Sequence, residues 1–260
     1  MSIHPTAVIH PEAEVAQDVI IHPYTIVEAG VRIGDGCEIG PNAVIRTGTR
    51  MGRNNRVTVG AVLGEHPQDL KFKGEESYLD VGDGNLIREY VTLHRATGEG
   101  NSTVIGNESM LMAYCHVGHN CSIGSNVMLA NCVQCGGHVV IEDFSVIGGL
   151  VGIHQFVRVG TMCMIAAGSG VRIDVPHYML VEGRPARPRN INVVGVRRHG
   201  VSKEGIEDLR RAFKALYRSE LNTSDAIERI RAQTQPTAEI ENLIEFLENI
   251  PKGERGRQLD

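Results

Sequence analysis

Residues 105–141 read IGNESM LMAYCH VGHNCS IGSNVM LANCVQ CGGHVV I when they are written in groups of six, and each group opens with an aliphatic residue or cysteine. The same step of six, with an aliphatic residue, methionine or cysteine at every position, runs from Ile3 to Leu63, from Val81 to Leu93 and from Ile105 to Val171. This period matches neither an α-helix, which repeats every 3.6 residues, nor the two-residue alternation of a hairpin strand. It is typical of a parallel β-helix, whose stacked coils bury a continuous inner column.

Two further columns accompany the aliphatic one. Small or β-branched residues such as Ala43 and Cys121 lie four positions after it, and glycine often follows it directly, as at Gly34, Gly106 and Gly124. We expect these glycines to allow tight turns with positive φ between short strands. The repeat resembles that of the hexapeptide acyltransferase superfamily. That resemblance implies a left-handed prism in which one coil comprises three hexads, or 18 residues.

The first part of the chain, residues 1–175, is therefore predicted to be a left-handed parallel β-helix. The six-residue step is lost twice, near 65–80 and near 96–103. We interpret both breaks as loops extruded from the prism, because long excursions from a regular scaffold often carry function.

The last third of the chain has a different pattern. Residues 176–200 are rich in Pro, Arg and Gly and are predicted to be a basic linker segment. Residues 201–260 are predicted to form a small helical domain with a helix capped by Ser202, a second capped by Ser224, and a third that ends before Pro251.

Composition and charge limit the possible functions. The 260 residues carry a net charge of −5, which argues against nucleic-acid binding over the whole surface. Residues 109–141 lack charged side chains but are dense in His, Asn, Ser and Gln, so they do not predict a membrane span. No targeting segment is expected at the N-terminus.

The six cysteines are predicted to be structural thiols. Cys132 and Cys135 form a C-x-x-C pair, which also occurs in zinc and redox sites. Five cysteines fall on the inward columns, where a small apolar side chain is required: Cys37, Cys115, Cys121, Cys135 and Cys163. Reduced thiols are consistent with a cytoplasmic location.

Histidines cluster within four coils. The cluster comprises His94, His116, His119, His138 and His154. With 18 residues per coil, His119 lies one coil below Gly137 and two coils below Gln155, and His138 is next to this site. Histidine can act as a general base near neutral pH, and a glycine N–H can approach closely enough to stabilise an oxyanion. A zinc site like that of the carbonic anhydrases of this superfamily is disfavoured, because the spacing His116-x-x-His119 differs from that family's pair and no acidic partner follows.

Two stretches have more than one interpretation. The uncharged face over 109–141 could pack against copies of itself, or it could line a groove for an aliphatic chain. The stretch 184–203 holds six basic residues and no acidic one. It could recognise phosphate or an acidic carrier protein, or it could be a solvated linker.

A closer resemblance, nearly end to end, is to the UDP-N-acetylglucosamine O-acyltransferase family of lipid A biosynthesis. It is carried by Gln68-Asp69-Leu70-Lys71, by Met112 through His119, by Gly136-Gly137-His138-Val139, by His154-Gln155-Phe156, and by Asn192 through Gly200. The resemblance implies transfer of a 3-hydroxyacyl chain from acyl carrier protein to the glucosamine 3-position. It also implies a homotrimer with active sites between subunits, and no cofactor other than the carrier's phosphopantetheine thioester, which is a co-substrate.

The resemblance also implies roles for individual residues. His119 would be the general base, and the N–H of Gly137 would stabilise the oxyanion. The residues implied to hold the sugar and nearby groups are Asp69, Lys71, His116, His138 and Gln155. Those implied to contact the nucleotide or phosphate are His94, Asn192 and Arg198.

This chain departs from the family pattern at Asn120, where members often carry an aspartate that orients the base, and at His199, where they often carry a further basic residue. We therefore expect weaker activation of His119 or a different orienting partner. The alternative functions are the N-acyltransferase of the next lipid A step, a coenzyme A-dependent acetyltransferase, and a solenoid kept as a binding module. The first of these carries a separate domain before its coils, whereas the hexads here begin at Ile3.

Overall fold

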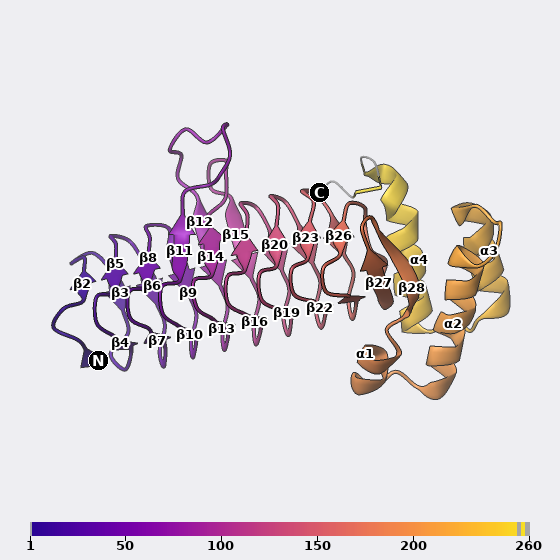
Figure 1. Cartoon of the computed structure of the whole chain (residues 1–260), viewed down its shortest axis with the longest axis horizontal. Helices are drawn as coiled ribbons and strands as arrows, with labels where there is room; N and C mark the ends of the chain where they lie inside the picture. The colour runs from indigo at the N-terminus through magenta and orange to yellow at the C-terminus, as the bar shows by residue number, and fades with distance from the viewer. Residues whose placement is uncertain (1, 254–255, 258–260) are drawn as a thin grey trace.

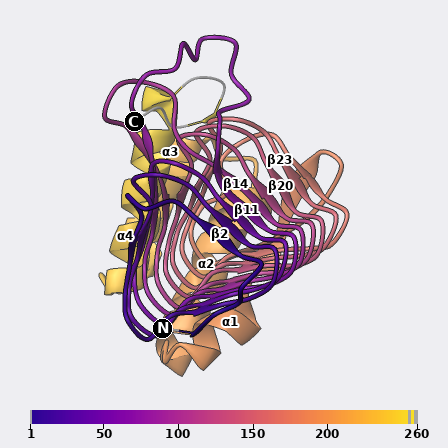
Figure 2. The same cartoon turned by 90° about the vertical axis from the view of Figure 1, so that its left-hand side faces the viewer.

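The structure is a computed structural model, and it describes residues 2–253 and 256–257. Residues 2–175 wind into the expected left-handed parallel β-helix, a rod that is long in Figure 1 and three-sided when it is seen end on in Figure 2. Each coil contributes one short strand to each of three sheets, here named A, B and C. In the described chain no helix is long and apolar enough to cross a membrane.

The strands of each sheet follow in stacking order. Sheet A contains β1 (Ser2–Ile3), β4 (Ile20–Ile21), β7 (Glu38–Ile39), β10 (Arg56–Val57), β13 (Leu86–Ile87), β16 (Met110–Leu111), β19 (Met128–Leu129), β22 (Val146–Ile147), β25 (Met164–Ile165), β27 (Met179–Gly183) and β28 (Ala186–Ile191). Sheet B contains β2 (Val8–Ile9), β5 (Ile26–Val27), β8 (Val44–Ile45), β11 (Val62–Glu65), β14 (Thr92–His94), β17 (His116–Val117), β20 (Gln134–Cys135), β23 (Gly152–Ile153) and β26 (Gly170–Val171). Sheet C contains β3 (Glu14–Val15), β6 (Arg32–Ile33), β9 (Thr49–Met51), β12 (Tyr78–Val81), β15 (Ser102–Ile105), β18 (Ser122–Ile123), β21 (Val140–Ile141) and β24 (Arg158–Val159).

The residue that opens each hexad points into the prism. Leu111 and Leu129 are fully buried and pair in register between β16 and β19, as do Val117 and Cys135 between β17 and β20. Burying an aliphatic side chain of this size stabilises the fold by about 1.5–3 kcal/mol. The column of aliphatics is therefore the core of the prism, as the sequence predicts.

The glycines that follow this column are needed for a reason other than the one expected. Gly106 does not have positive φ, but a Cβ at its position would lie only 2.6 Å from the backbone carbon of Gly124 in the next coil. Positive φ occurs instead at the corners, for example at Gly36 and Asn42. Close stacking of successive coils, rather than tight turning, therefore requires a residue without a side chain here.

Two loops leave the prism where the six-residue step is lost. Residues 66–77 connect β11 to β12, and residues 95–101 connect β14 to β15. The loops are hydrogen-bonded to each other, because Gly100 N–H donates to Glu76 O at 2.8 Å and Gly98 N–H donates to the Glu75 carboxylate at 2.8 Å. Figure 1 shows them projecting together from one side of the rod.

The segment 176–200 is not the linker that its composition predicts. β27 pairs in parallel with β25 and then turns back into antiparallel β28, so the hairpin extends sheet A beyond the last coil. Helix α1 (Val193–Arg198) follows. The hairpin forms because Met179, Val181 and Ile191 bury their side chains against the end of the prism. Its Arg residues point outward, which is why the composition resembles that of a linker.

Three helices then cover this end of the prism: α2 (Lys203–Tyr217), α3 (Thr223–Gln233) and α4 (Ala238–Asn249), followed by a 3-10 turn, η1 (Ile250–Lys252). Ser202 caps α2 as predicted. The predicted cap Ser224 is wrong, because the side chain of Asn222 accepts the capping hydrogen bond from Asp225 N–H instead. Pro251 lies within η1, one residue after the start of that turn.

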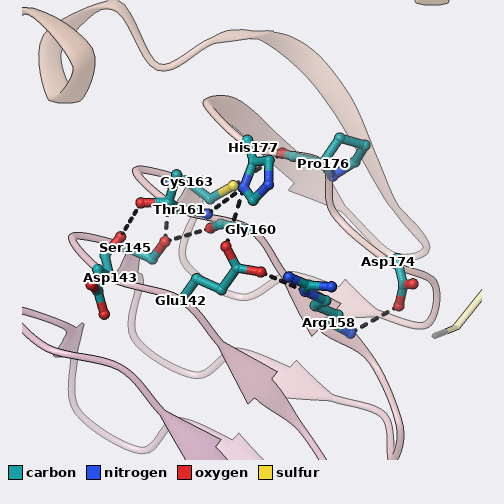
Figure 3. Close-up of polar contacts among 10 residues, drawn as sticks. All are labelled: Glu142, Asp143, Ser145, Arg158, Gly160, Thr161, Cys163, Asp174, Pro176 and His177. Atoms are coloured by element: carbon teal, nitrogen blue, oxygen red, sulfur yellow. Dashed lines mark hydrogen bonds and ion pairs between the residues drawn. The ribbon is translucent and has the colours of Figure 1, made fainter. Parts of the chain in front are cut away.

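A polar cluster joins the last coils to α4 (Figure 3). The Glu142 carboxylate binds Arg158 and lies 3.3 Å from Nδ1 of His177. The backbone N–H of Thr161 donates to that same Nδ1 at 2.8 Å, so Nδ1 carries a lone pair and the ring is neutral. The His177 ring packs edge-on against Phe246 of α4, with the centroids 4.8 Å apart.

We predict that this cluster makes stability depend on pH. Burial above all, and then the charge of Arg158, lowers the pKa of His177 to about 4. An unfolded histidine has a pKa of about 6.5, so the unfolded chain binds more protons between these values. Stability is thus full above pH 6.5 and is lost as pH falls toward 4. The expected loss from this residue between pH 7 and pH 5 is about 1–2 kcal/mol.

The measurement is urea unfolding at pH 7 and at pH 5, for the wild type and for His177→Asn, whose side-chain oxygen can still accept from Thr161. The variant should lose less stability on acidification than the wild type. Exposed His10→Asn is the matched control and should behave like the wild type. An identical loss in the wild type and His177→Asn contradicts the prediction.

Candidate functional site

An open pocket of about 620 Å³ lies on the outer face of sheet B and on the corner that leads to sheet C. It contains members of the histidine cluster, the Gly-Gly step and one residue of the first extruded loop. Its lining residues include His116, His119, Gly136, Gly137, His154, Gln155, Gln68 and Arg172. The spacing argument from an 18-residue coil thus brought the right residues together.

The floor of the pocket is a stack of outward-facing positions. His116 pairs in register with Gln134, Gln134 with Gly152, and Gly152 with Gly170. Side-chain volume therefore falls from an imidazole to nothing along sheet B. A Cβ added at Gly152 would meet no atom within 4 Å, so the space above this glycine is open. The result is a channel that leads from the histidines toward the C-terminal end of the prism.

His119 lies directly against the Gly-Gly step. It follows β17 in the corner turn, and a Cβ at Gly137 would fall 2.5 Å from His119 Nε2 and 2.6 Å from Cε1. Only glycine at 137 allows the ring to occupy this place. Among hydrogen bonds between described residues, none uses the N–H of Gly137, so this donor is available to a ligand beside the imidazole.

Asn120 fixes the orientation of the His119 ring. Its amide pairs twice with the backbone of Thr97 in the second loop: Thr97 N–H donates to Oδ1 at 2.9 Å, and Nδ2 donates to Thr97 O at 3.0 Å. These partners identify the oxygen of the amide. The same Oδ1 lies 2.8 Å from His119 Nδ1, so Nδ1 carries the proton and Nε2 has a free lone pair on the side of Gly137.

The other histidines are packed against one another. His94 and His116 meet edge-on at 4.9 Å between ring centroids, and His119 and His138 do so at 5.3 Å. Burial, and then the proximity of His94 and His119, lowers the pKa of His116 to about 4, and its Nδ1 is 2.8 Å from Thr92 Oγ1. His116 is therefore neutral at pH 7 and presents a polar but uncharged edge to the pocket.

The first loop brings Asp69 near the pocket. Lys71 N–H donates to its carboxylate at 3.0 Å, and this hydrogen bond is the main cause that lowers the pKa of Asp69, with a further contribution from nearby His119. The side chain of Lys71 is exposed. Asp69 therefore places a negative charge on the side of the pocket that carries the base.

Two predicted site residues lie elsewhere. Asn192 uses its side chain to cap α1, through Gly195 N–H, and to donate to Met162 O at 2.8 Å. Arg198 is exposed in the last turn of α1. Neither lines the pocket formed by this chain. His94 is only 5% exposed and contacts the pocket through His116 rather than by itself.

The left-handed hexapeptide prism with a histidine beside a Gly-Gly step defines the class of hexapeptide-repeat acyltransferases. Residues 102–137 match the family model described as bacterial transferase hexapeptide (six repeats), and residues 174–257 match the model described as UDP N-acetylglucosamine O-acyltransferase, domain 2.

Relatives of known name match almost the whole chain. The acyl-(acyl-carrier-protein)–UDP-N-acetylglucosamine O-acyltransferase of Halorhodospira halophila is 43% identical over 252 residues, and the one of Burkholderia orbicola is 45% identical over 256 residues; each match covers 96% of this chain and 98% of the relative. The crystal structure of a UDP-N-acetylglucosamine acyltransferase from Bacteroides fragilis superposes with a TM-score of 0.92 at 41% identity, covering 99% of both chains. The chain therefore belongs to the UDP-N-acetylglucosamine O-acyltransferase family, and it is an O-acyltransferase.

Sequence reasoning missed three contributors to the site. Thr97 acts only through its backbone, which no residue pattern reveals. Gly152 and Gln134 follow His116 at steps of 18 residues, and this spacing could have shown that they share its face.

We predict that Gly137→Ala folds but displaces the His119 imidazole. The new Cβ would overlap the ring by contact at about 2.5 Å, and a side chain can rotate away where backbone could not. The melting temperature should stay within a few degrees of the wild-type value, and acyltransferase activity should fall at least tenfold. A crystal structure of the variant would show the new position of the ring.

Gly152→Ala is the control for that displacement, because its Cβ enters open space in the same pocket and should leave His119 in place. An undisturbed His119 in Gly137→Ala would show that the contact is not limiting.

Proposed function

We propose that the protein transfers a 3-hydroxyacyl chain from the thioester of an acyl carrier protein to the 3-hydroxyl of UDP-N-acetylglucosamine, with His119 as general base. The supporting observation is the orientation of His119: Asn120 Oδ1 accepts from Nδ1–H, so the Nε2 lone pair faces the pocket beside the free N–H of Gly137. The names of the relatives supply the substrate classes.

The proposed reaction needs no group that the chain and its two substrates lack. His119 Nε2 takes the proton of the sugar hydroxyl while that oxygen forms a bond to the thioester carbon. The carbonyl oxygen becomes an oxyanion, which accepts from the N–H of Gly137. Collapse of the intermediate breaks the carbon–sulfur bond. The proton held by His119 then passes to the leaving thiolate, which restores the neutral base.

Asn120 accounts for the departure from the family pattern. Its amide oxygen holds the ring in the required tautomer, which meets the need for an orienting partner. A neutral amide does not stabilise the imidazolium as a carboxylate would, since hydrogen bonds to charged acceptors are about twice as strong. We therefore propose that the Thr97–Asn120 pair supplies orientation without charge, and that the nearby carboxylate of Asp69 supplies part of the charge.

The remaining substrate contacts are proposals of the same kind. We assign the sugar to Asp69, Lys71, His138 and Gln155, and the neutral edge of His116 to the same group. Arg198 would bind the nucleotide phosphates from α1, which Asn192 holds in place by capping it. Because Arg198 lies outside the pocket of its own chain, this contact requires a neighbouring subunit. His94 supports His116 by packing against it.

A homotrimer is supported by the outer face of sheet A. Apolar side chains stack on this face in register over five coils: Leu86, Met110, Met128, Val146 and Met164. The adjoining corner adds the stacked rings of Tyr90 and Tyr114, 5.2 Å apart, and Leu150, which is 65% exposed. A continuous apolar strip of this length is characteristic of a surface that another protein covers. We propose that copies of the chain cover it.

The carrier protein and the compartment complete the proposal. Basic side chains on the hairpin and α1 are exposed and suit an acidic carrier: Arg184, Arg187, Arg189, Arg197 and Arg198. We propose a cytoplasmic location, supported by the six free cysteines. Burial raises the pKa of Cys121 and Cys163 to about 12, so these thiols stay protonated inside the prism.

The first test of the mechanism compares the wild type with His119→Ala. Both are assayed for acyl transfer from a series of acyl carrier protein thioesters to UDP-N-acetylglucosamine. We expect transfer by the wild type and a loss of at least about 10²-fold in the variant, because a general base contributes that much. His22→Ala, on an early coil far from the pocket, should retain full activity.

Equal rates for the wild type and His119→Ala would overturn the role of His119. Transfer only from coenzyme A thioesters, or only to an amino group of a sugar, would overturn the substrate assignment. No transfer by any variant would favour a binding module.

We predict that Met128→Glu dissociates the trimer. Met128 is 37% exposed at the middle of the apolar face, so the single chain should tolerate the carboxylate while the interface should not. Light scattering after gel filtration should show a fall from about three chains to one. Val104→Glu, on the outer face of sheet C at 38% exposure, is the matched control and should stay trimeric. A trimeric Met128→Glu variant would place the interface elsewhere.

A further inference from the structure

The C-terminal tail returns to the prism and contacts the active-site pocket. After α4 and η1 the chain reaches Gly256, whose carbonyl oxygen accepts from Asp174 N–H at 2.8 Å. The next residue, Arg257, is only 8% exposed. Its guanidinium lies between the tail and the turn after β23, at His154 and Gln155, two residues that line the pocket. A residue from the end of the chain is thus buried behind the wall of the site.

The contact determines which nitrogen of His154 carries the proton. Arg257 Nη1 lies 2.7 Å from His154 Nδ1. A guanidinium has donors and no acceptor, so Nδ1 must offer its lone pair. The same Nη1 donates to the carbonyl oxygen of Gln155 at 3.2 Å. His154 is therefore held as the Nε2–H tautomer, with Nε2 as the ring nitrogen that is left for a ligand.

A competing partner makes this assignment depend on Arg257. The carbonyl oxygen of Gln155 lies 3.1 Å from His154 Nδ1, which is hydrogen-bond distance. Without the guanidinium, Nδ1–H would donate to this oxygen, and Nε2 would become an acceptor. One ring position can thus present either a donor or an acceptor to the pocket, and Arg257 decides between them.

We propose that Arg257 is a positioning residue that holds His154 as a hydrogen-bond donor to an oxygen acceptor of the bound substrate. The proposal rests on the proposed function only for the identity of that substrate. It makes His154 the counterpart of His119 across the pocket. Asn120 gives His119 a free lone pair on Nε2, whereas Arg257 gives His154 a proton on Nε2. One histidine accepts and the other donates.

The test uses the full-length protein and Arg257→Met, which keeps the aliphatic packing but removes the donors and the charge. Long-range ¹H–¹⁵N spectra of protein labelled in its histidines report each tautomer, and the His154 signals are those missing from His154→Gln. We expect Nε2–H in the wild type and a shift to Nδ1–H in Arg257→Met. Arg257→Lys, which retains a cationic donor, should restore Nε2–H. The same tautomer in the wild type and Arg257→Met overturns the proposal.

Steady-state kinetics supply a second readout that a purely structural role would not change. In Arg257→Met, KM for one of the two substrates should rise about tenfold, as for loss of a hydrogen bond made on binding, while kcat changes little. Lys252→Met is the matched control, because Lys252 lies on the same tail but contacts only Asn249. Its KM values and the melting temperatures of both variants should equal those of the wild type.

An unchanged KM for both substrates in Arg257→Met overturns the substrate contact. A wild type without any acyl transfer would contradict the proposed function, whereas the tautomer measurement would still decide the role of Arg257.

Discussion

The hydrogen-bonded register between each strand and the strand one coil later is the constraint on which the rest of the structure depends. It places every hexad's leading residue above the previous one, so the interior is a single column of aliphatic side chains. A coil has no core of its own and gains stability only from its neighbours. The register therefore fixes both the inside and the outside of the prism. Any residue repeated at 18-residue steps forms a straight row on the surface.

The active site uses such rows. His116, Gln134, Gly152 and Gly170 form one row on sheet B, and the fall in side-chain volume along it leaves a channel. The corner beside it stacks His119 under the Gly-Gly step of the next coil. A rigid backbone thus sets the distance between base and oxyanion donor, which is the kind of preorganisation that catalysis requires. The mobile parts of the reaction are left to the substrates.

The two histidines that face the pocket acquire different roles from contacts outside the repeat. The second loop supplies the backbone of Thr97 to lock Asn120, and Asn120 in turn orients His119. The C-terminal tail supplies Arg257 to His154. In both cases an excursion from the prism returns to set the proton position of a side chain that the prism carries. The regular scaffold places the rings, and the irregular segments decide their chemistry.

Residue patterns alone determined the parallel β-helix, its inner column, the two extruded loops and the approach of His119 to Gly137, because all of these follow from one period that is visible in the chain. Periodicity did not reveal the hairpin of β27 and β28, since its buried Met179, Val181 and Ile191 lie among prolines and arginines that dominate the composition.

Only the tertiary structure decided that Asn120 pairs with Thr97, 23 residues away, and that Arg257 reaches His154, 103 residues away. These contacts bring together segments with no common repeat. Their energy comes from single directed hydrogen bonds, and a linear pattern holds no trace of such bonds.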